Sequence, residues 1–341
     1  MAQTVKPSQL AAQLKINIEH NLPTMIWGPP GCGKSEITQQ TIQDLGRNHI
    51  DLRMNLLDPV DMRGIPSIET DDCGLKRTVW SVPDFLPVPA IHGNSGVLML
   101  EELTTAPQSV QTTGYQLVRD RAVGNYKLPN GWAIIALGNN LSDQAATFDM
   151  PAPLKNRFAH LWLEPDINDL IKHAAQNAWH EMVVAYLRFK PENMFKFTPE
   201  NTAYQTPRSW EMASTRLKIG NLNPETMFIV LSGIIGEAGA ADFVGFMKLV
   251  DQLPDLTLIE TMPDKAPVPT DIGSRFALIG ALAQNTTPVN FQAFIDYTKR
   301  MDPNLHIAYM RDVTLANEML MASPIFTKWC ADPQNQALFT E

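Results

Sequence analysis

The sequence is poor in cysteine, and this shortage already excludes two classes of protein. Only three cysteines occur among the 341 residues, and they are widely spaced with no CxxC pair. An odd number at such spacing suits neither a disulfide scaffold nor a structural zinc site. It is typical of a reducing compartment, so we expect a cytoplasmic protein.

Positive charge is also in deficit. Lys and Arg number 27 against 36 Asp and Glu, which gives a formal net charge of −9. A protein that coats nucleic acid has the opposite balance, so nucleic acid is not an expected partner. Charged residues make up 18% of the chain and hydrophobic residues 44%, enough for a large core, so a disordered chain is excluded as well.

Long apolar runs without charge are missing. The most apolar stretch, residues 227–247, contains Glu237 and Asp242. Each carboxylate would cost about 2.5–3.5 kcal/mol near the centre of a bilayer. The stretch therefore predicts a pair of buried helices, and we expect neither a membrane span nor an export signal.

Short apolar runs alternate with helical or turn-rich segments in the first half of the chain. The predicted strands cover residues 23–27, 51–56, 96–100, 132–137 and 161–163. Helical patterns at 34–45 and 106–118 lie between some of them, and crossovers of this length call for a parallel sheet covered by helices. After about residue 164 only helical periodicity follows, interrupted by a Pro-rich linker at residues 262–269.

A glycine-rich segment between the first of these strands and its helix fits the Walker A pattern GxxxxGK[ST]. It consists of Gly28, Pro29, Pro30, Gly31, Cys32, Gly33, Lys34 and Ser35. In such a P-loop, backbone N–H groups surround phosphate oxygens and the helix N-terminus adds its positive end. Lys34 is predicted to reach the β- and γ-phosphates and Ser35 to ligate Mg²⁺. Cys32 is expected to be a tolerated small residue; an oxidation-sensitive thiolate is the alternative.

Two carboxylates follow the apolar strand at residues 96–100. Such a strand can end in one carboxylate near the metal ion and a second that orients the attacking water. Glu101 is predicted to take the metal role and Glu102 the water-activating role. The first of these positions is usually Asp, and Glu is longer by one methylene.

Three further polar side chains complete the candidate site. Asn139 follows the strand at 132–137 and is predicted to hold the lytic water, with Asn140 as the alternative. Arg157 precedes the last strand and is predicted to reach a neighbouring subunit's γ-phosphate as an arginine finger. Arg208 stands at a helix start, where a cation has no favourable dipole partner, so an external anion is expected there.

In this order and spacing, the elements resemble the AAA+ ATPases and, within them, the MoxR-like group. Residues 101–107 resemble a DEINRAP-type box in their second acid and closing Ala-Pro, but Thr104 and Thr105 replace its Asn-Arg. Residues 136–140 resemble the sensor 1 box, 156–158 the DRF box and 207–209 the sensor 2 box. Residues 119–129 resemble the hairpin before the sensor strand, and residues 77–83, within 64–86, would hold a helix-2 insertion.

The resemblance implies an α/β fold with a P-loop NTPase core of the AAA+ type, a parallel sheet flanked by helices. An all-helical lid and a helical C-terminal extension would follow. The implied domains are residues 1–165 for the nucleotide-binding core, 166–255 for the lid and 256–341 for the extension. ATP and Mg²⁺ would be the cofactors, and Arg208 would couple the nucleotide state to the lid angle.

The resemblance also implies an activity and partners. The chain would hydrolyse ATP in a homo-oligomeric ring, usually a hexamer, and remodel a protein client as a chaperone-like enzyme, with a von Willebrand factor A domain protein as partner. Two alternatives stay open. The first is a DNA motor or replication-initiator ATPase using the basic residues Arg119, Arg121 and Lys127. The second is a nucleotide-gated scaffold with little hydrolysis, prompted by Glu101 in place of Asp.

Overall fold

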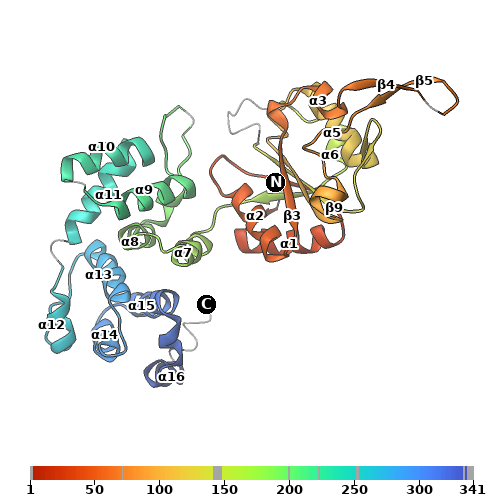
Figure 1. Cartoon of the computed structure of the whole chain (residues 1–341). Coiled ribbons are helices and arrows are strands. Elements are labelled where there is room, and N and C mark those ends of the chain that lie inside the picture. The colour runs from red at the N-terminus through yellow and green to blue at the C-terminus, as the bar shows by residue number, and fades with distance from the viewer. Residues whose placement is uncertain are drawn as a thin grey trace. The chain divides into compact units, whose positions relative to one another are not determined.

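The structure is a computed structural model of the chain. It describes residues 3–70, 72–140, 148–198, 200–221, 223–250, 253–332 and 335. The chain divides into two compact units, Met1–Asp166 and Ile167–Glu341 (Figure 1).

The first unit is built on a six-stranded parallel sheet with the strand order β1-β10-β2-β9-β6-β3. These strands are β1 (Thr4–Val5), β2 (Thr24–Trp27), β3 (Asn48–Arg53), β6 (Ser95–Glu101), β9 (Gly131–Gly138) and β10 (Ala159–Leu163). In β6 and β9, consecutive residues 97–100 and 133–136 are completely buried. Burial of both faces is typical of a parallel sheet covered by helices on either side.

Six helices and two hairpins accompany this sheet. The helices are α1 (Pro7–Glu19), α2 (Lys34–Asp44), α3 (Pro59–Arg63), α4 (Pro89–His92), α5 (Gln108–Asp120) and α6 (Ala152–Lys155) in the described part of the unit. The antiparallel hairpins pair β4 (Pro66–Thr70) with β5 (Lys76–Trp80) and β7 (Ala122–Val123) with β8 (Tyr126–Lys127). Val110 and Leu117 of α5 share an apolar cluster with Leu98 and Leu100 of β6, so α5 covers one face of the sheet.

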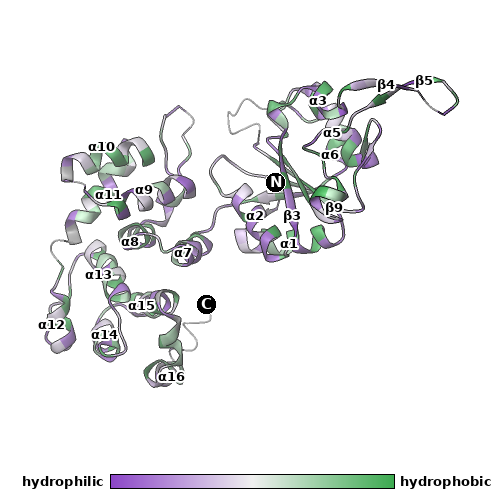
Figure 2. Cartoon of the chain, viewed as in Figure 1, coloured by the Kyte–Doolittle hydropathy of each residue, from purple (hydrophilic) through white to green (hydrophobic). Residues whose placement is uncertain are grey.

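The described residues of the second unit form helices joined by loops, with one isolated β-bridge between Lys196 and Gln205. Its helices are α7 (Ile167–Gln176), α8 (Glu181–Phe189), α9 (Pro207–Ile219), α10 (Pro224–Ile235), α11 (Glu237–Val250), α12 (Leu256–Thr261), α13 (Ile272–Gln284), α14 (Phe291–Thr298), α15 (Pro303–Ala316) and α16 (Pro324–Cys330). Hydrophobic and hydrophilic residues alternate along them (Figure 2), as amphipathic packing requires. They form two apolar clusters, one from α7 to α11 and one from α12 to α16, and α13 contributes side chains to both.

One buried ion pair joins these clusters within the second unit. Arg188 on α8 donates to the carboxylate of Asp312 on α15, and both side chains are largely removed from solvent. Burial raises the pKa of Asp312 to about 6, against the attraction of the guanidinium. The pair therefore ties α8 to α15 by an interaction that only a correctly packed unit can make.

The predicted fold class is confirmed: a P-loop core of parallel strands flanked by helices is followed by helices alone. The helix pair predicted from residues 227–247 is present as α10 and α11, and no helix in the described parts of the chain is long and apolar enough to span a membrane. The strand predicted at 51–56 was placed wrongly. The strand β3 ends at Arg53, because residues 54–56 turn into a 3₁₀ helix. The boundary between lid and extension stays a prediction.

Candidate functional site

The glycine-rich segment connects β2 to α2 at the carboxyl edge of the sheet. Gly31 and Gly33 have φ of 76° and 96°, in the left-handed region that favours glycine. A Cβ on Gly28 would lie 3.0 Å from Sγ of Cys32 and 3.3 Å from the carbonyl oxygen of Leu163. The tight path of the loop therefore depends on these glycines, and Cys32 is a buried small residue within it.

Lys34 turns back over this loop. Its Nζ donates to the carbonyl oxygens of Gly28 at 2.7 Å and Pro29 at 3.0 Å. It also donates to Oδ1 of Asn139 at 2.9 Å, across 105 residues of sequence. The ammonium group thus lies between the loop and the end of β9, where it can face a phosphate held by the loop.

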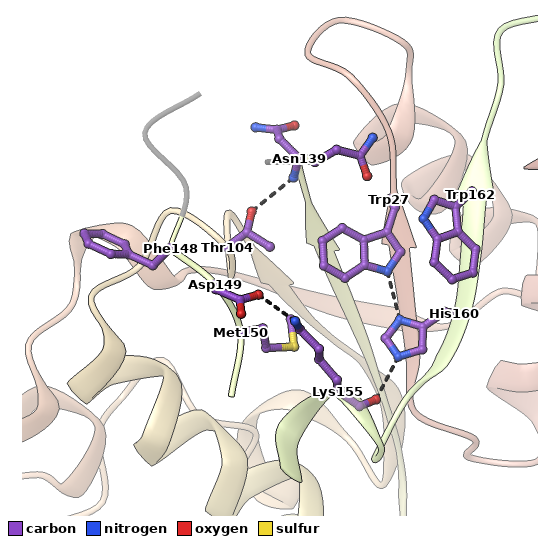
Figure 3. A pocket seen from close by; sticks show the side chains of 10 residues that line it. Trp27, Thr104, Asn139, Phe148, Asp149, Met150, Lys155, His160 and Trp162 are labelled. Carbon is purple, nitrogen blue, oxygen red and sulfur yellow. Dashed lines mark hydrogen bonds and ion pairs between the residues drawn. The ribbon is translucent and has the colours of Figure 1, made fainter. Parts of the chain in front are cut away.

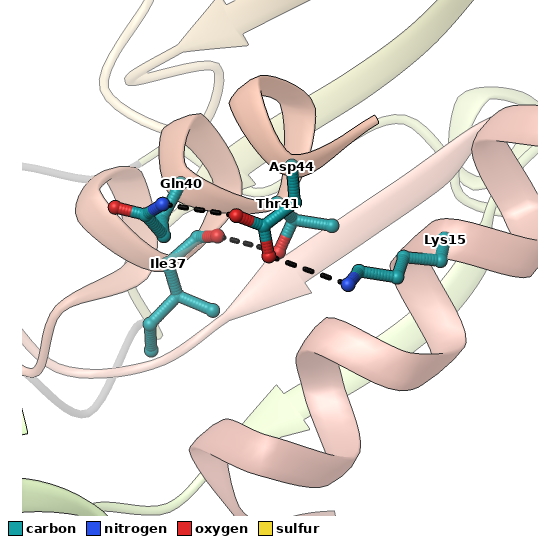
Figure 4. A network of polar contacts seen from close by, with 5 residues as sticks. All are labelled: Lys15, Ile37, Gln40, Thr41 and Asp44. Carbon is teal, nitrogen blue, oxygen red and sulfur yellow. Dashed lines mark hydrogen bonds and ion pairs between the residues drawn. The ribbon is translucent and has the colours of Figure 1, made fainter. Parts of the chain in front are cut away.

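The helix that carries Lys34 is fixed from its other end. Asp44 on α2 accepts from Nε2 of Gln40 at 3.0 Å and from Nζ of Lys15 on α1 at 3.3 Å (Figure 4). The hydrogen bond from Gln40 and the nearby Lys15 lower the pKa of Asp44. These groups are exposed, so the network contributes little energy, but it orients α2 against α1.

Glu101 at the end of β6 lies beside Ser35 at the start of α2. Burial raises the pKa of the Glu101 carboxyl, and the hydrogen bond from the Ser35 hydroxyl acts in the opposite direction. The negative charges of Asp51 and Glu102 raise the pKa further. The two residues predicted to ligate Mg²⁺ are therefore neighbours and supply oxygen ligands, the kind that this ion prefers.

Glu102 and Asn139 meet at the same edge of the sheet. Nδ2 of Asn139 donates to Oε2 of Glu102 at 3.4 Å, while its Oδ1 accepts from Lys34. Asn139 is only 7% exposed, so it bridges the cation and the carboxylate in partial isolation from solvent. We call this arrangement the Lys34–Asn139–Glu102 chain. Asn140, the alternative, lines the neighbouring pocket, as Asn139 also does.

The two predicted arginines are both exposed. Arg157 is exposed just after α6 and contacts the hydroxyl of Tyr115 on α5; together with Arg119, which has the larger effect, it lowers the pKa of that hydroxyl. Arg208 is an exposed residue in the first turn of α9, whose N-cap Thr206 accepts a hydrogen bond from the N–H of Ser209. The structure brings the P-loop, Glu101, Glu102 and Asn139 together and leaves both arginines at the surface of their units.

A pocket of about 340 Å³ adjoins Asn139 (Figure 3). Nε1 of Trp27 donates to Nδ1 of His160 at 2.8 Å, and Nε2 of His160 lies 2.7 Å from the carbonyl oxygen of Lys155. Because a carbonyl can only accept, the network assigns the proton of His160 to Nε2. Trp162 stacks beside Trp27, with ring centroids 6.4 Å apart. Sequence analysis missed this pocket, although aromatic rings at alternate positions of the last strand were its signal.

Comparison with known proteins assigns neither a family nor a function to the chain. No protein-family model matches the chain, and no curated protein matches it. NtrX from Brucella abortus is 14% identical with a TM-score of 0.41, over all of this chain and 69% of that one. Its complex with ATP gives 14% and 0.40 over 94% and 66% of the two chains. The RuvB Holliday junction branch migration motor of Thermotoga maritima gives 15% and 0.38 over 75% of each chain. Likenesses this weak support no assignment, so the P-loop NTPase fold rests on the sheet and loop described above.

Proposed function

We propose that this chain is an AAA+ ATPase that hydrolyses ATP to ADP and phosphate with Mg²⁺. The observation that carries the proposal is the Lys34–Asn139–Glu102 chain, which links a P-loop cation to a carboxylate through one amide. A phosphate loop alone would bind a nucleotide. A carboxylate held beside the same cation adds a base that can activate water.

The residues present fit the substrate and its metal ion. Lys34 and the backbone N–H groups of the loop would hold the β- and γ-phosphates, which can displace the carbonyl oxygens that Lys34 now contacts. The Ser35 hydroxyl and the Glu101 carboxylate would hold Mg²⁺. In the described residues no group of three or more His, Cys, Asp or Glu side chains is arranged to hold a metal ion by itself, and Mg²⁺ commonly needs only one or two protein ligands besides phosphates. When bound, the ion would neutralise charge on the phosphates.

The reaction follows from these positions. Glu102 accepts a proton from a water molecule whose oxygen forms a bond to the γ-phosphorus, while the bond from that phosphorus to the bridging oxygen of ADP breaks. The electron pair of the broken bond leaves with ADP. Asn139, within hydrogen-bond distance of Glu102, orients the water and the γ-phosphate.

The finer parts of the proposal concern assembly. Arg157 is exposed, so it can supply its charge to the site of the next subunit in a ring, and Arg208 can report nucleotide state to the lid. A MoxR-like hexamer that remodels a protein client, with a von Willebrand factor A domain protein as partner, is the version we favour. This version rests on the sequence resemblance.

One observation weakens the DNA-motor alternative. The predicted basic patch is engaged within the chain: Arg119 pairs with Asp120 at 2.7 Å, and Arg121 donates to the carbonyl oxygens of Pro129 and Trp132. Measuring ATP turnover will distinguish the nucleotide-gated scaffold from the ATPase.

The test is ATP turnover measured against protein concentration, with light-scattering mass in Mg-ATP. Glu102→Gln removes the base and is expected to lower kcat about 10²–10⁴-fold, the usual contribution of a general base, with nucleotide affinity retained. The exposed Glu19→Gln on α1 is the matched control and should turn over like the wild type. Unchanged turnover in Glu102→Gln would refute the assigned mechanism, and ATP binding without any turnover in the wild type would favour the scaffold.

A further inference from the structure

Two threonines follow the candidate catalytic acids, at positions where the sequence departs from the pattern it resembles. Oγ1 of Thr105 lies 3.3 Å from Oε2 of Glu102 and 3.0 Å from the carbonyl oxygen of the same residue. The N–H of Thr105 donates to that carbonyl as well, at 3.1 Å. Thr105 therefore contacts both the backbone and the side chain of Glu102.

Glu102 needs such support because its backbone is unusual. Its φ is +55°, in the left-handed region that residues with a side chain seldom adopt. Such conformations persist where surrounding contacts determine them, and they concentrate at functional sites. The N–H of Leu103 donates to the carbonyl oxygen of Leu137 on β9, so the turn is held on its other side too.

Thr104 makes a comparable supporting contact with Asn139. Its Oγ1 accepts from the N–H of Asn139 at 3.1 Å, and the residue is 2% exposed. A Cβ on Gly138 would lie 2.6 Å from Cγ2 of Thr104, so the threonine packs directly against the end of β9. The paired threonines thus connect the turn carrying Glu102 to the strand carrying Asn139.

Among the described residues, Oε2 of Glu102 has two donors within reach, Nδ2 of Asn139 at 3.4 Å and Oγ1 of Thr105 at 3.3 Å, and the single hydrogen of that hydroxyl is shared with the Glu102 carbonyl oxygen at 3.0 Å. A carboxylate fixed by two donors on one oxygen presents the other oxygen, Oε1, in a defined direction. A base works only when it lies within hydrogen-bond reach of the proton it accepts. The orientation of Oε1 is therefore under the control of these two donors.

We propose that Thr105 is a positioning residue for Glu102: its hydroxyl fixes the carboxylate so that Oε1 faces the attacking water. This inference rests on the proposed function. It assigns Thr105 an effect on the chemical step and none on nucleotide affinity, because the residue acts through Glu102 and not on the phosphates.

The experiment measures steady-state and single-turnover ATP hydrolysis by the full chain. Thr105→Val keeps the shape and removes the hydroxyl, and kcat is expected to fall about tenfold, part of what a general base contributes, with KM within about twofold. Thr105→Ser restores the hydroxyl and should restore kcat. Thr112→Val is the matched control, since the exposed Thr112 hydroxyl bonds only to the helix carbonyl of Gln108.

A double-mutant cycle tells positioning from a general structural effect. If Thr105 acts through Glu102, Thr105→Val will cause no further loss of the single-turnover rate in the Glu102→Gln background. An equal loss in both backgrounds, or wild-type kcat in Thr105→Val, would overturn the inference. Failure of the proposed function is seen separately, as unchanged turnover in Glu102→Gln alone. Should Thr105→Val unfold, the Ser variant and Thr105→Ala in the same cycle decide.

Discussion

The two halves of the candidate site differ in how fully one chain builds them. Lys34, Asn139 and Glu102 form continuous hydrogen bonds at the edge of the sheet, with Ser35 and Glu101 beside them. The two predicted arginines are exposed: Arg157 contacts Tyr115 on α5, and Arg208 lies in the first turn of α9. One unit of the chain thus brings together the groups that we propose to bind phosphate and activate water, whereas the roles proposed for Arg157 and Arg208 depend on groups outside their own unit.

The largest effect that we predict as a test of this comparison is the loss of ATP turnover on replacing Arg157. If the arginine acts in the site of a neighbouring subunit, Arg157→Ala should lower kcat about 10³-fold or more, as loss of an arginine finger does. Nucleotide affinity should change little, because Lys34 and the loop are intact. The measurement is ATP turnover above the concentration at which the chain assembles.

Mixing variants shows whether the arginine works between subunits. Lys34→Ala cannot hold ATP but retains Arg157, while Arg157→Ala retains the loop. Mixed together, the two inactive variants should regain activity that neither shows alone. If the mixture stays inactive while both variants assemble, Arg157 does not act across an interface, and the contrast between the two halves has another cause.

A smaller effect concerns Glu101 and pH. Burial raises the pKa of this carboxyl, and a protonated carboxyl cannot ligate a cation. As the pH is lowered, Mg²⁺ binding should therefore begin to weaken at a higher pH than it would with an ordinary glutamate. Below the pKa of Glu101, the affinity for Mg²⁺ should fall about tenfold for each pH unit. The Mg²⁺ concentration for half-maximal turnover, measured from pH 5 to 8, checks this. Glu101→Gln should need more Mg²⁺ throughout and show a flatter profile.

The smallest predicted effect concerns the exposed ion pair between Lys15 on α1 and Asp44 on α2. Lys15→Ala removes the exposed pair with Asp44 and should lower the free energy of unfolding by less than about 1 kcal/mol. ATP affinity should stay within about twofold of the wild type. Urea titration and nucleotide binding measure the two quantities. A large loss of affinity would mean that the α1–α2 network, and not the loop alone, sets the position of Lys34.

Local patterns made much of this fold predictable from the sequence. The strands around residues 97–100 and 133–136 are uninterrupted apolar runs, and the P-loop needs glycine at fixed places. The short edge strand β1 and the helix α3 were missed, because a strand of two residues and a helix of five residues are too short to show a hydrophobic period. The sequence signals for α3 are Pro59 in its first turn and the acidic residues Asp58 and Asp61. In the structure, each of these two side chains accepts from the backbone N–H of the other residue.

The site itself was only partly predictable. The sequence identified the members of the site one by one, from their places after predicted strands. The contact of Lys34 with Asn139, however, depends on β9 lying next to β2 in the sheet. These two strands are far apart in the chain. No local pattern gives that order. The part played by Thr104 and Thr105 was equally hidden, because a hydroxyl after a strand becomes informative only when its partner is located.

The ion pair between Arg188 and Asp312 has a consequence for how the helical unit can be divided. Ending the chain near residue 255 would remove Asp312 and leave the largely buried guanidinium of Arg188 without this partner. Removing one partner of a buried ion pair commonly lowers the free energy of unfolding by about 3–5 kcal/mol. The same cut would also remove α13, which supplies Ala277 to the cluster formed by α7 to α11. The helices that follow residue 256 therefore stabilise those before it, and we expect the two groups of helices to unfold in one transition.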